Sequence, residues 1–294
     1  MSCEMDYLLK MPDIVMNQIL GNLDFFNILR LRKVCHALRF FIDNYSNLDS
    51  KLHVKWKRNG RDHLRIGENS NFFDRFLKDF GTFWKHQKGT LQRLNVQLND
   101  HYSSVYLEEF QTILDQKFKI QELEIKIINP EDILKILPFV DPEEIIIVNR
   151  LYNLVPFETN GIEDLEQWRN AKSLKISGFV ITVPIEKILH FQECFVRFDT
   201  LSFRDVEDLK KAFLLDSNLE YFKIEFENSD VITELLREFG QPLLLTARFR
   251  ANRKMWFFKT DDTNQVFVIR LYSRHIDFQR MQISMIPPGA VILE

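Results

Sequence analysis

Apolar residues recur at a helical spacing over residues 11–42. Pro12 followed by Asp13 indicates a helix start, because proline at the first turn lacks only an N–H that would be unpaired there anyway. Asn22 and Asp24 interrupt the pattern and offer a break and a new cap. The spacing predicts three short helices that carry more apolar surface than about 40 residues can bury alone. Because this stretch holds one cysteine and no cluster of metal ligands, a protein partner is the natural source of the missing burial.

A second pattern, apolar-x-x-apolar-x-apolar, recurs every 21–29 residues in the middle of the chain. Each copy reads as a short strand, and helical stretches such as 105–118 and 185–191 follow several of them. A strand-plus-helix unit of this length has the spacing of a leucine-rich repeat, in which stacked units share one core. The asparagine ladder of typical leucine-rich repeats is missing, so we expect an α+β or α/β fold built as a degenerate solenoid. The six copies begin at Leu91, Ile120, Pro142, Ala171, Phe198 and Leu219.

Alternation within these strands predicts which side chains point away from the core. Most of this outward row is polar and of mixed sign, as a protein-binding surface can be. Ile146 and Val148 differ, because residues 145–148 are apolar on both sides of the strand. Either a loop such as 151–157 covers them, which is the more ordinary arrangement in parallel sheets, or they anchor a bound partner. The candidate contacts for a bound target protein are Gln97, Glu124, Lys126, Ile146, Val148, Lys175, Arg204 and Lys223.

Hairpin patterns flank the repeats. Residues 52–66 alternate around Asn59-Gly60, which supplies the positive φ angles of a tight turn, and an aromatic stripe over 72–84 predicts an amphipathic helix. Near the end of the chain, 254–259 and 266–272 read as two strands joined by a polar turn. The expected domains are three helices over 8–48, a linker hairpin and aromatic helix over 49–90, repeats over 91–245 and a hairpin region over 246–294.

Composition restricts the class of protein. With 294 residues, 45% of them hydrophobic and 28% charged, the chain is globular and long enough for one large domain or two. No window approaches 18 uncharged apolar residues, so no membrane span is predicted, and no secretory leader is visible. Cys3, Cys35 and Cys194 are few and far apart, which fits a reducing compartment and argues against disulfides or structural zinc. We therefore expect a protein of the cytoplasm or nucleus.

The net charge of −3 hides two basic segments. Residues 51–65 carry six Lys or Arg against one Asp, and residues 246–280 carry eight against three. Such segments could bind nucleic acid or acidic peptides. Neither has an RNA-binding aromatic signature or a helix-turn-helix context, so we favour solvated strand edges, where lysine deters pairing between sheets. Binding of nucleic acid through the basic hairpins is the less favoured alternative.

Sequence motifs of catalysis are not found. The nine glycines never lie within five residues of one another, so no Walker loop, GxGxxG loop or Gly-x-Ser-x-Gly elbow can form. His190 and Cys194 stand four residues apart, a helical spacing that could pair a thiolate with an imidazole or give half a metal site. A packed cysteine is the favoured interpretation of Cys194. We expect no enzyme, no cofactor and no bound metal.

The apolar pattern over residues 11–42 resembles an F-box, the motif by which substrate receptors dock onto the Skp-type adaptor of cullin-RING ubiquitin ligases. The positions of the family's sequence pattern are occupied here by Met11-Pro12, Val15, Ile19-Leu20, Leu23, Ile28, Leu31-Arg32, Val34-Cys35 and Leu38-Arg39. Met11 replaces the usual Leu, Ile14 an acid and Leu38 a Trp, and all three remain apolar. The alternative is an ordinary helical cap on the following domain. The resemblance implies adaptor docking through Met11, Pro12, Val15, Ile19, Leu20, Leu23, Ile28, Leu31, Val34 and Leu38.

The order of F-box, aromatic helix, strand–helix repeats and terminal hairpin is similar to that of the nematode F-box A family, in which an FTH domain follows the F-box. This resemblance implies a non-catalytic substrate receptor of an SCF-type ubiquitin ligase. The adaptor would link the chain to a cullin, and the FTH-like repeats would hold an unidentified target protein. A stand-alone interaction scaffold without ligase attachment is the other class of protein that the sequence leaves open.

Overall fold

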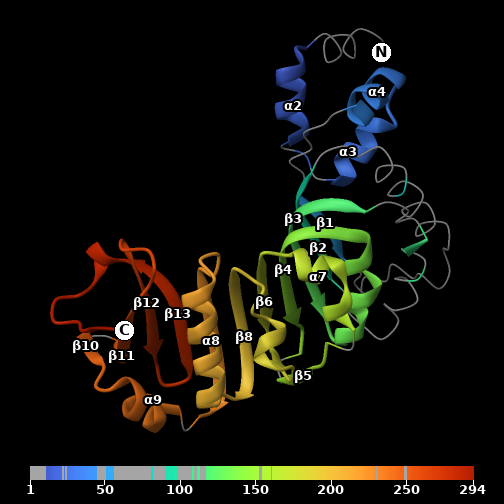
Figure 1. Ribbon diagram of the computed structural model, residues 1–294. Helices are drawn as coiled ribbons and strands as arrows, with labels where there is room; N and C mark the ends of the chain where they lie inside the picture. Colours follow the sequence, from blue (N-terminus) through green and yellow to red (C-terminus); the bar gives the residue numbers. More distant parts are fainter. Residues whose placement is uncertain are drawn as a thin grey trace. The chain divides into compact units, whose positions relative to one another are not determined.

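The computed structural model describes residues 11–21, 23, 25–44, 51–55, 81, 90–97, 108, 111–112, 117–151, 154–159, 161–229, 231–247 and 250–294. The chain divides into two compact units. The first comprises Met1–Ile146 with Asp164–Trp168, and the second comprises Ile147–Glu163 with Arg169–Glu294. Figure 1 shows short helices near the N-terminus, followed by strands and further helices.

Three short helices lie near the N-terminus, as the apolar spacing predicts. They are α2 (Asp13–Gly21), α3 (Phe25–Arg32) and α4 (His36–Asn44). The amide of Val15 donates to the Pro12 carbonyl at 2.9 Å, so the proline stands at the turn that begins α2. Four apolar side chains of these helices are almost fully buried and form their small core: Met16, Leu20, Leu38 and Ile42.

Parallel strands follow in the first unit. β1 (Lys51–Lys55) pairs with β2 (Leu91–Gln97), and β2 pairs with β3 (Phe118–Ile127). The next strand in the order is β4 (Val140–Asn149), of which residues 140–146 belong to this unit. Alternate side chains of these strands are completely buried and form the core of the first unit: Leu94, Val96, Leu123, Ile125, Ile127 and Ile145.

The connections of the first unit are tight. Between β3 and β4 the chain forms two 3-10 helices, η1 (Pro130–Lys135) and η2 (Leu137–Phe139). Part of α7 (Glu166–Asn170) belongs to the same unit, and Gln167 Nε2 donates to the Pro138 carbonyl at 3.3 Å. These turns cover the apolar side of the strands with few residues.

The second unit contains a sheet in the order β6-β8-β9-β13-β12-β11-β10. Neighbours from β6 to β9 are parallel, and neighbours from β9 to β10 are antiparallel. Short strands β5 (Val155–Phe157) and β7 (Phe179–Ile181) pair in parallel, and β7 also pairs with β8. β14 (Ile292–Leu293) runs parallel to β11. The strands of the main order are β6 (Ser173–Ser177), β8 (Glu193–Thr200), β9 (Tyr221–Asn228), β13 (His275–Gln282), β12 (Gln265–Leu271), β11 (Arg250–Lys259) and β10 (Leu243–Ala247).

Two helices, α8 (Phe203–Leu215) and α9 (Val231–Phe239), lie in the connections of this sheet. Phe213 of α8 stacks on Phe267 with 5.0 Å between ring centroids and meets the edge of Phe222 at 5.4 Å. Phe239 of α9 packs edge-on against Phe258 at 5.1 Å. Since aromatic side chains bury the largest apolar areas, this cluster dominates the core of the second unit.

A small second core lies on the opposite side of the same sheet. Met255, Phe257, Val266 and Val268 are buried there. Residues near the C-terminus cover them, because Ile286 and Ala290 pack on this cluster and Ile292 pairs with Phe257. The C-terminal segment therefore packs on the sheet and contributes apolar contacts to it.

Asn149, at the end of β4, and Gly178 are joined in the second unit. Asn149 Nδ2 donates to the Gly178 carbonyl at 2.8 Å, and Asn149 Oδ1 accepts from the Leu151 amide at 2.9 Å. Gly178 has a φ of +76°, and an added Cβ would stand 2.8 Å from the Asn149 Cβ. The close approach needs glycine at this position for both reasons.

Arg280 of β13 fastens the end of α8 to the sheet. Its guanidinium donates to the carbonyls of Phe213, Asp216 (2.8 Å) and Leu219 (3.1 Å). The last carbonyls of a helix lack partners within the helix, and a cation is favourable there. Replacing Arg280 by Ala is expected to lower the free energy of unfolding by about 2–3 kcal/mol, since charge-assisted hydrogen bonds are lost.

Urea unfolding followed by circular dichroism measures this loss. Arg280→Lys should recover only part of it, because an ammonium group lacks the planar fork that reaches three carbonyls. Arg274→Ala removes an exposed arginine six positions earlier in the chain and serves as the control. Equal urea midpoints for the Arg280→Ala and Arg274→Ala proteins would contradict the assignment.

The strands of the predicted repeats are present, but their connections differ from the prediction. The copies that begin at Leu91, Ile120, Pro142, Ala171 and Leu219 coincide with β2, β3, β4, β6 and β9. In the described parts of the chain no solenoid of equal strand–helix units is found. The expected helix over 185–191 is reduced to the 3-10 helix η4 (Ile185–Lys187), and the sheet continues from β9 through β13, β12, β11 and β10 with antiparallel neighbours. The fold is mixed α/β, with parallel pairs among the strands up to β9.

The prediction of a strand at the copy that begins at Phe198 is wrong. β8 ends at Thr200, and Phe203 begins α8 with Ser202 as its N-cap. The spacing that fits a strand is met here by the end of a strand joined to the start of a helix. The signal that sequence reasoning missed is the capping box, in which Ser202 and Asp205 bond to each other's backbone amides.

The predicted flanking hairpins have different outcomes. At the C-terminal side, β11 and β12 form the expected antiparallel pair, with Trp256 opposite Ile269, and β10 and β13 extend it to four strands. At the other side, the first arm of the predicted hairpin is β1, which pairs in parallel with β2. The turn at Asn59-Gly60 and the second arm lie outside the described residues, as do nearly all of the helices expected over 72–84 and 105–118.

Candidate functional site

The N-terminal helices expose apolar side chains. Ile14 is 76% exposed, Phe40 73% and Val34 50%. Of the residues predicted to dock an adaptor, Leu20 and Leu38 are buried in the core of the helices and cannot form its surface. Ile28 lies in α3, and its side chain is outside the described part. The exposed candidates are Met11, Pro12, Val15 and Val34, and the half-buried ones are Ile19, Leu23 and Leu31.

In the first unit, polar side chains on the open side of β2 and β3 pair with one another. We call these residues, Arg93, Asn95, Glu122, Glu124 and Lys126, the first-unit strand face. Arg93 pairs with Glu122 at 2.5 Å, and Glu124 accepts from Asn95 and lies 2.8 Å from the Lys126 ammonium. Two of the predicted target contacts, Glu124 and Lys126, are therefore joined in one network. Gln97 lies directly opposite Lys126 in the register.

In the second unit, the side of the sheet that also holds the small second core at β11 and β12 carries a denser set of polar and aromatic groups on the neighbouring strands. Arg197 lies 2.8 Å from Glu227 and 3.9 Å from Glu225, and the Lys223 ammonium lies 2.9 Å from Glu225. Lys175, a predicted contact, places its ammonium 5.2 Å from the centre of the Phe195 ring. We call this set the second-unit strand face: Lys175, Phe195, Arg197, Tyr221, Lys223, Glu225, Arg270, His275, Asp277 and Gln279.

Three titratable groups lie near the middle of the second-unit strand face. Burial raises the pKa of the Asp277 carboxyl, which is 5% exposed, while His275 and Arg270 oppose the shift. Burial also lowers the pKa of the His275 imidazole, whose Nε2 lies 3.9 Å from Asp277 Oδ1. Burial and the neighbouring Asp277 raise the pKa of Tyr221 to about 12, so the phenol keeps its proton.

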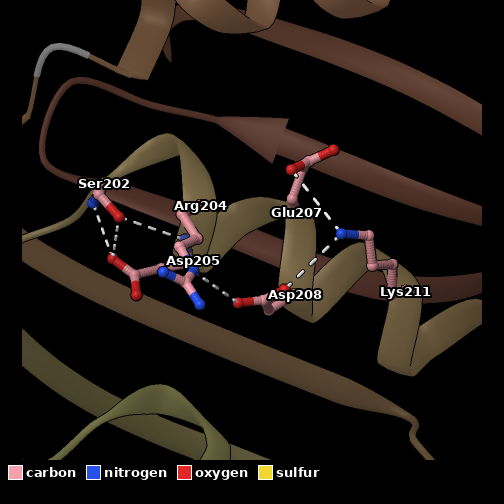
Figure 2. Close-up of polar contacts among 6 residues, drawn as sticks. All are labelled: Ser202, Arg204, Asp205, Glu207, Asp208 and Lys211. Atoms are coloured by element: carbon pink, nitrogen blue, oxygen red, sulfur yellow. Dashed lines mark hydrogen bonds and ion pairs between the residues drawn. The ribbon is translucent and has the colours of Figure 1, made fainter.

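Arg204 is the predicted contact that the structure places elsewhere. It lies on α8, its side chain is 86% exposed, and its Nε is 3.8 Å from Asp208. Figure 2 shows this pair beside the capping box of Ser202 and Asp205, with Lys211 close to both Glu207 and Asp208. Arg204 therefore belongs to the solvent-facing ion pairs of α8 and does not join the second-unit strand face.

Ile146 and Val148 of β4 are both half-buried. Ile146 belongs to the first unit and Val148 to the second. Both point away from the core that Ile145 and Ile147 fill, as the alternation predicts. Whether they anchor a partner is a prediction that binding experiments must test.

The spacing of His190 and Cys194 does not produce a helical pair. Cys194 is a fully buried residue of β8, where burial raises the pKa of its thiol. His190 precedes the strand, and its ring is tilted against that of Phe191 with 4.0 Å between the centroids. The packed interpretation of Cys194 is confirmed. Among the described residues, no group of three or more His, Cys, Asp or Glu side chains could hold a metal ion. The described helices include none that is long and apolar enough to cross a membrane.

Most of the second-unit strand face was missed by sequence reasoning. Phe195 and Arg197 alternate with buried residues along β8, so the correct strand register would have identified them. Arg270, His275 and Asp277 join the face only because β13 pairs with β9. No local pattern reports that pairing, since the two strands are some 50 residues apart in the chain.

Comparisons with known proteins match two domain families. Residues 8–49 match the F-box domain, and residues 104–242 match the FTH domain. F-box A protein 224 of Caenorhabditis elegans is 22% identical over 293 residues, which cover 88% of this chain and 75% of the relative. No solved structure matches. The chain therefore carries an N-terminal F-box domain followed by an FTH domain, and it is a distant homologue of a C. elegans F-box A protein.

Proposed function

We propose that this chain is the substrate receptor of an SCF-type cullin-RING ubiquitin ligase. The F-box would bind a Skp-type adaptor and, through it, a cullin, and the FTH domain would bind the target. The observation that carries this proposal is the F-box match over 8–49, on helices whose apolar side chains Ile14, Val34 and Phe40 lie exposed. Exposed apolar groups on a small unit are typical of a surface that a partner covers.

The role proposed for the chain is binding without catalysis. Holding the target on the same assembly as the ubiquitin-transfer machinery raises its effective concentration there, and no covalent step on this chain is required. We assign the adaptor to residues 8–48 and the target to the strands of 91–245, with 49–90 as a linker region and 246–294 as part of the target-binding domain. As a subunit of such a ligase, the protein would act in the cytoplasm or nucleus.

The two strand faces suit a protein partner. They combine fixed ion pairs, such as Arg197 with Glu227, with aromatic rings such as Phe195 and Tyr221. Aromatic residues and arginine are the types that contribute most to binding at protein interfaces. The basic segment 246–280 is less suited to nucleic acid, because the Arg280 guanidinium is occupied by the carbonyls of α8.

Co-expression of the full chain with a Skp-type adaptor, followed by size-exclusion chromatography, tests the proposal. We expect a one-to-one complex that also captures a cullin. Elution of a folded chain apart from the adaptor would reject ligase attachment and leave a stand-alone interaction scaffold. Retention on heparin that falls steeply with salt would instead support binding of nucleic acid.

A further inference from the structure

A groove of ≈ 770 Å³ lies on the open side of the sheet in the second unit. Its lining combines aromatic rings and methionines with charged groups from several strands. The residues that matter for its chemistry are Glu193, Phe195, Tyr221, Arg270, Gln279 and Met285. All of them lie within the second unit, so the groove is formed by that unit alone.

The part of the groove lining on β8 and β9 is apolar and aromatic. The rings of Phe195 and Tyr221 are tilted by 55° with 5.2 Å between their centroids. Met285 is 69% exposed beside them, and Met281 supplies a second flexible thioether. Aromatic rings next to methionine form a surface that accepts a large apolar side chain in more than one conformation.

The two sides of the groove carry opposite charges. Glu193 of β8 and the neighbouring Glu220 supply carboxylates on one side. Arg270 of β12 supplies a guanidinium on the other, and its bond to Gln279 Oε1 uses only some of its five N–H donors. Arg280 also lines the groove, but its guanidinium is committed to the carbonyls at the end of α8.

The strand order fixes the separation of these charges. Glu193 and Arg270 stand on β8 and β12, with β9 and β13 between them. Three steps between neighbouring strands span about 14 Å, at about 4.8 Å each. The register puts Val268 in line with Glu193, and Arg270 stands two residues further along β12, so the two Cα atoms are about 16 Å apart. The Arg270 side chain shortens this distance, because its guanidinium reaches back to Gln279, which is in line with Glu193. An extended chain advances about 3.3 Å per residue, so two residues four positions apart are about 13 Å apart and point to the same side. The residue midway between them points to that side as well.

We propose that this groove binds an extended segment of the target that carries a basic and an acidic residue four positions apart, with a large apolar residue midway. The basic residue meets Glu193 and Glu220, the apolar residue rests on Tyr221 with the Phe195 ring at its side, and the acidic residue meets Arg270. Because the spacing is symmetric, either chain direction satisfies it. This proposal rests on the proposed function, since it describes how the FTH domain recognises a target.

Fluorescence anisotropy with labelled nonapeptides tests the charge order on the full chain bound to its adaptor. The three probes contain Lys-Ser-Phe-Ser-Glu, Lys-Ser-Phe-Ser-Lys or Glu-Ser-Phe-Ser-Glu at their centre. The natural chain should bind the mixed probe about three- to tenfold more tightly than either of the others, as expected when one ion pair is replaced by repulsion. Replacing the central Phe by Ser in the mixed probe should reduce binding further.

Charge reversal in the protein should exchange the preference. Arg270→Glu is expected to bind the Lys-Ser-Phe-Ser-Lys probe best, and Glu193→Lys the Glu-Ser-Phe-Ser-Glu probe. A gain for the matched probe cannot come from misfolding, so both variants remain informative. Arg204→Glu changes an exposed charge outside the groove and should leave the order of the three probes as in the natural chain.

The outcomes for the groove and for ligase attachment are separate. Equal binding of all probes, or an order that neither reversal changes, would reject recognition in this groove while adaptor binding in the same preparations upholds the proposed function. A concentration-dependent dimer that Arg270→Glu abolishes would assign the groove to a second copy of this chain. Loss of adaptor binding with the predicted probe order intact would reject ligase attachment and leave the groove assignment standing.

Discussion

Val15→Asp combined with Val34→Asp is expected to weaken binding of the full chain to a Skp-type adaptor by at least about 100-fold. Both side chains are exposed on the N-terminal helices, and covering an apolar side chain of this size stabilises a complex by about 1.5–3 kcal/mol. The double variant loses that contribution at both positions, and it places two carboxylates in a surface that must be dehydrated on binding. Isothermal titration calorimetry of purified adaptor into each protein measures the change.

Two comparisons separate lost docking from lost folding. His36→Asp with Ala37→Asp adds the same charge at exposed positions of α4 that lie outside the predicted docking set, and adaptor affinity should remain within about threefold. Leu20→Asp places a carboxylate in a fully buried site and should unfold the three helices. Unchanged affinity for the Val15 and Val34 double variant would refute the docking surface.

Phe213→Ala is expected to cost about 3–5 kcal/mol of stability in the second unit, the range for a buried aromatic residue reduced to alanine. The Phe213 ring meets Phe222, Phe267 and Phe278, which lie on three neighbouring strands of the sheet. Its removal leaves a cavity where α8 packs on the junction between parallel and antiparallel strands. Urea unfolding and hydrogen exchange of β12 and β13 report the loss.

Leu215 provides the matched control for this change. It is the last residue of the same helix and is 88% exposed, so Leu215→Ala should alter stability by less than about 0.5 kcal/mol. Similar urea midpoints for Phe213→Ala and Leu215→Ala would mean that α8 does not pack on the aromatic cluster. Adaptor binding should persist in both proteins, because the F-box helices are not changed.

Local patterns predicted the elements in which buried and exposed side chains alternate regularly along the chain. The three N-terminal helices and strands β2, β3, β4, β6 and β9 follow from periodicity alone, as does the pairing of β11 with β12. The wrong strand prediction at Phe198 arose because the same apolar spacing fits both a strand and a junction between a strand and a helix. The Ser202 capping box distinguishes the two, so that error was avoidable.

Other features could not be predicted from local patterns because distant residues create them. Arg280 reaches the Asp216 carbonyl across 64 positions, and β13 enters the sheet beside β9 although β10, β11 and β12 separate them in the chain. The same pairing brings Arg270 to the groove. Basic residues such as Arg253 and Lys254 lie on β11, an interior strand, so the interpretation of this segment as a solvated sheet edge was wrong.

The position of β13 also imposes an order of events during synthesis. β9 leaves the ribosome first, but its neighbour β13 is translated only after β10, β11 and β12. Until residues 275–282 emerge, one edge of β9 is unpaired. Strands β10, β11 and β12 cannot join its sheet, because β13 is the strand that pairs with both β9 and β12. Nascent chains with an open strand edge are prone to wrong pairing and aggregation. The interval in which residues 229–282 are translated is therefore the one in which we expect this edge of β9 to be open to wrong pairing.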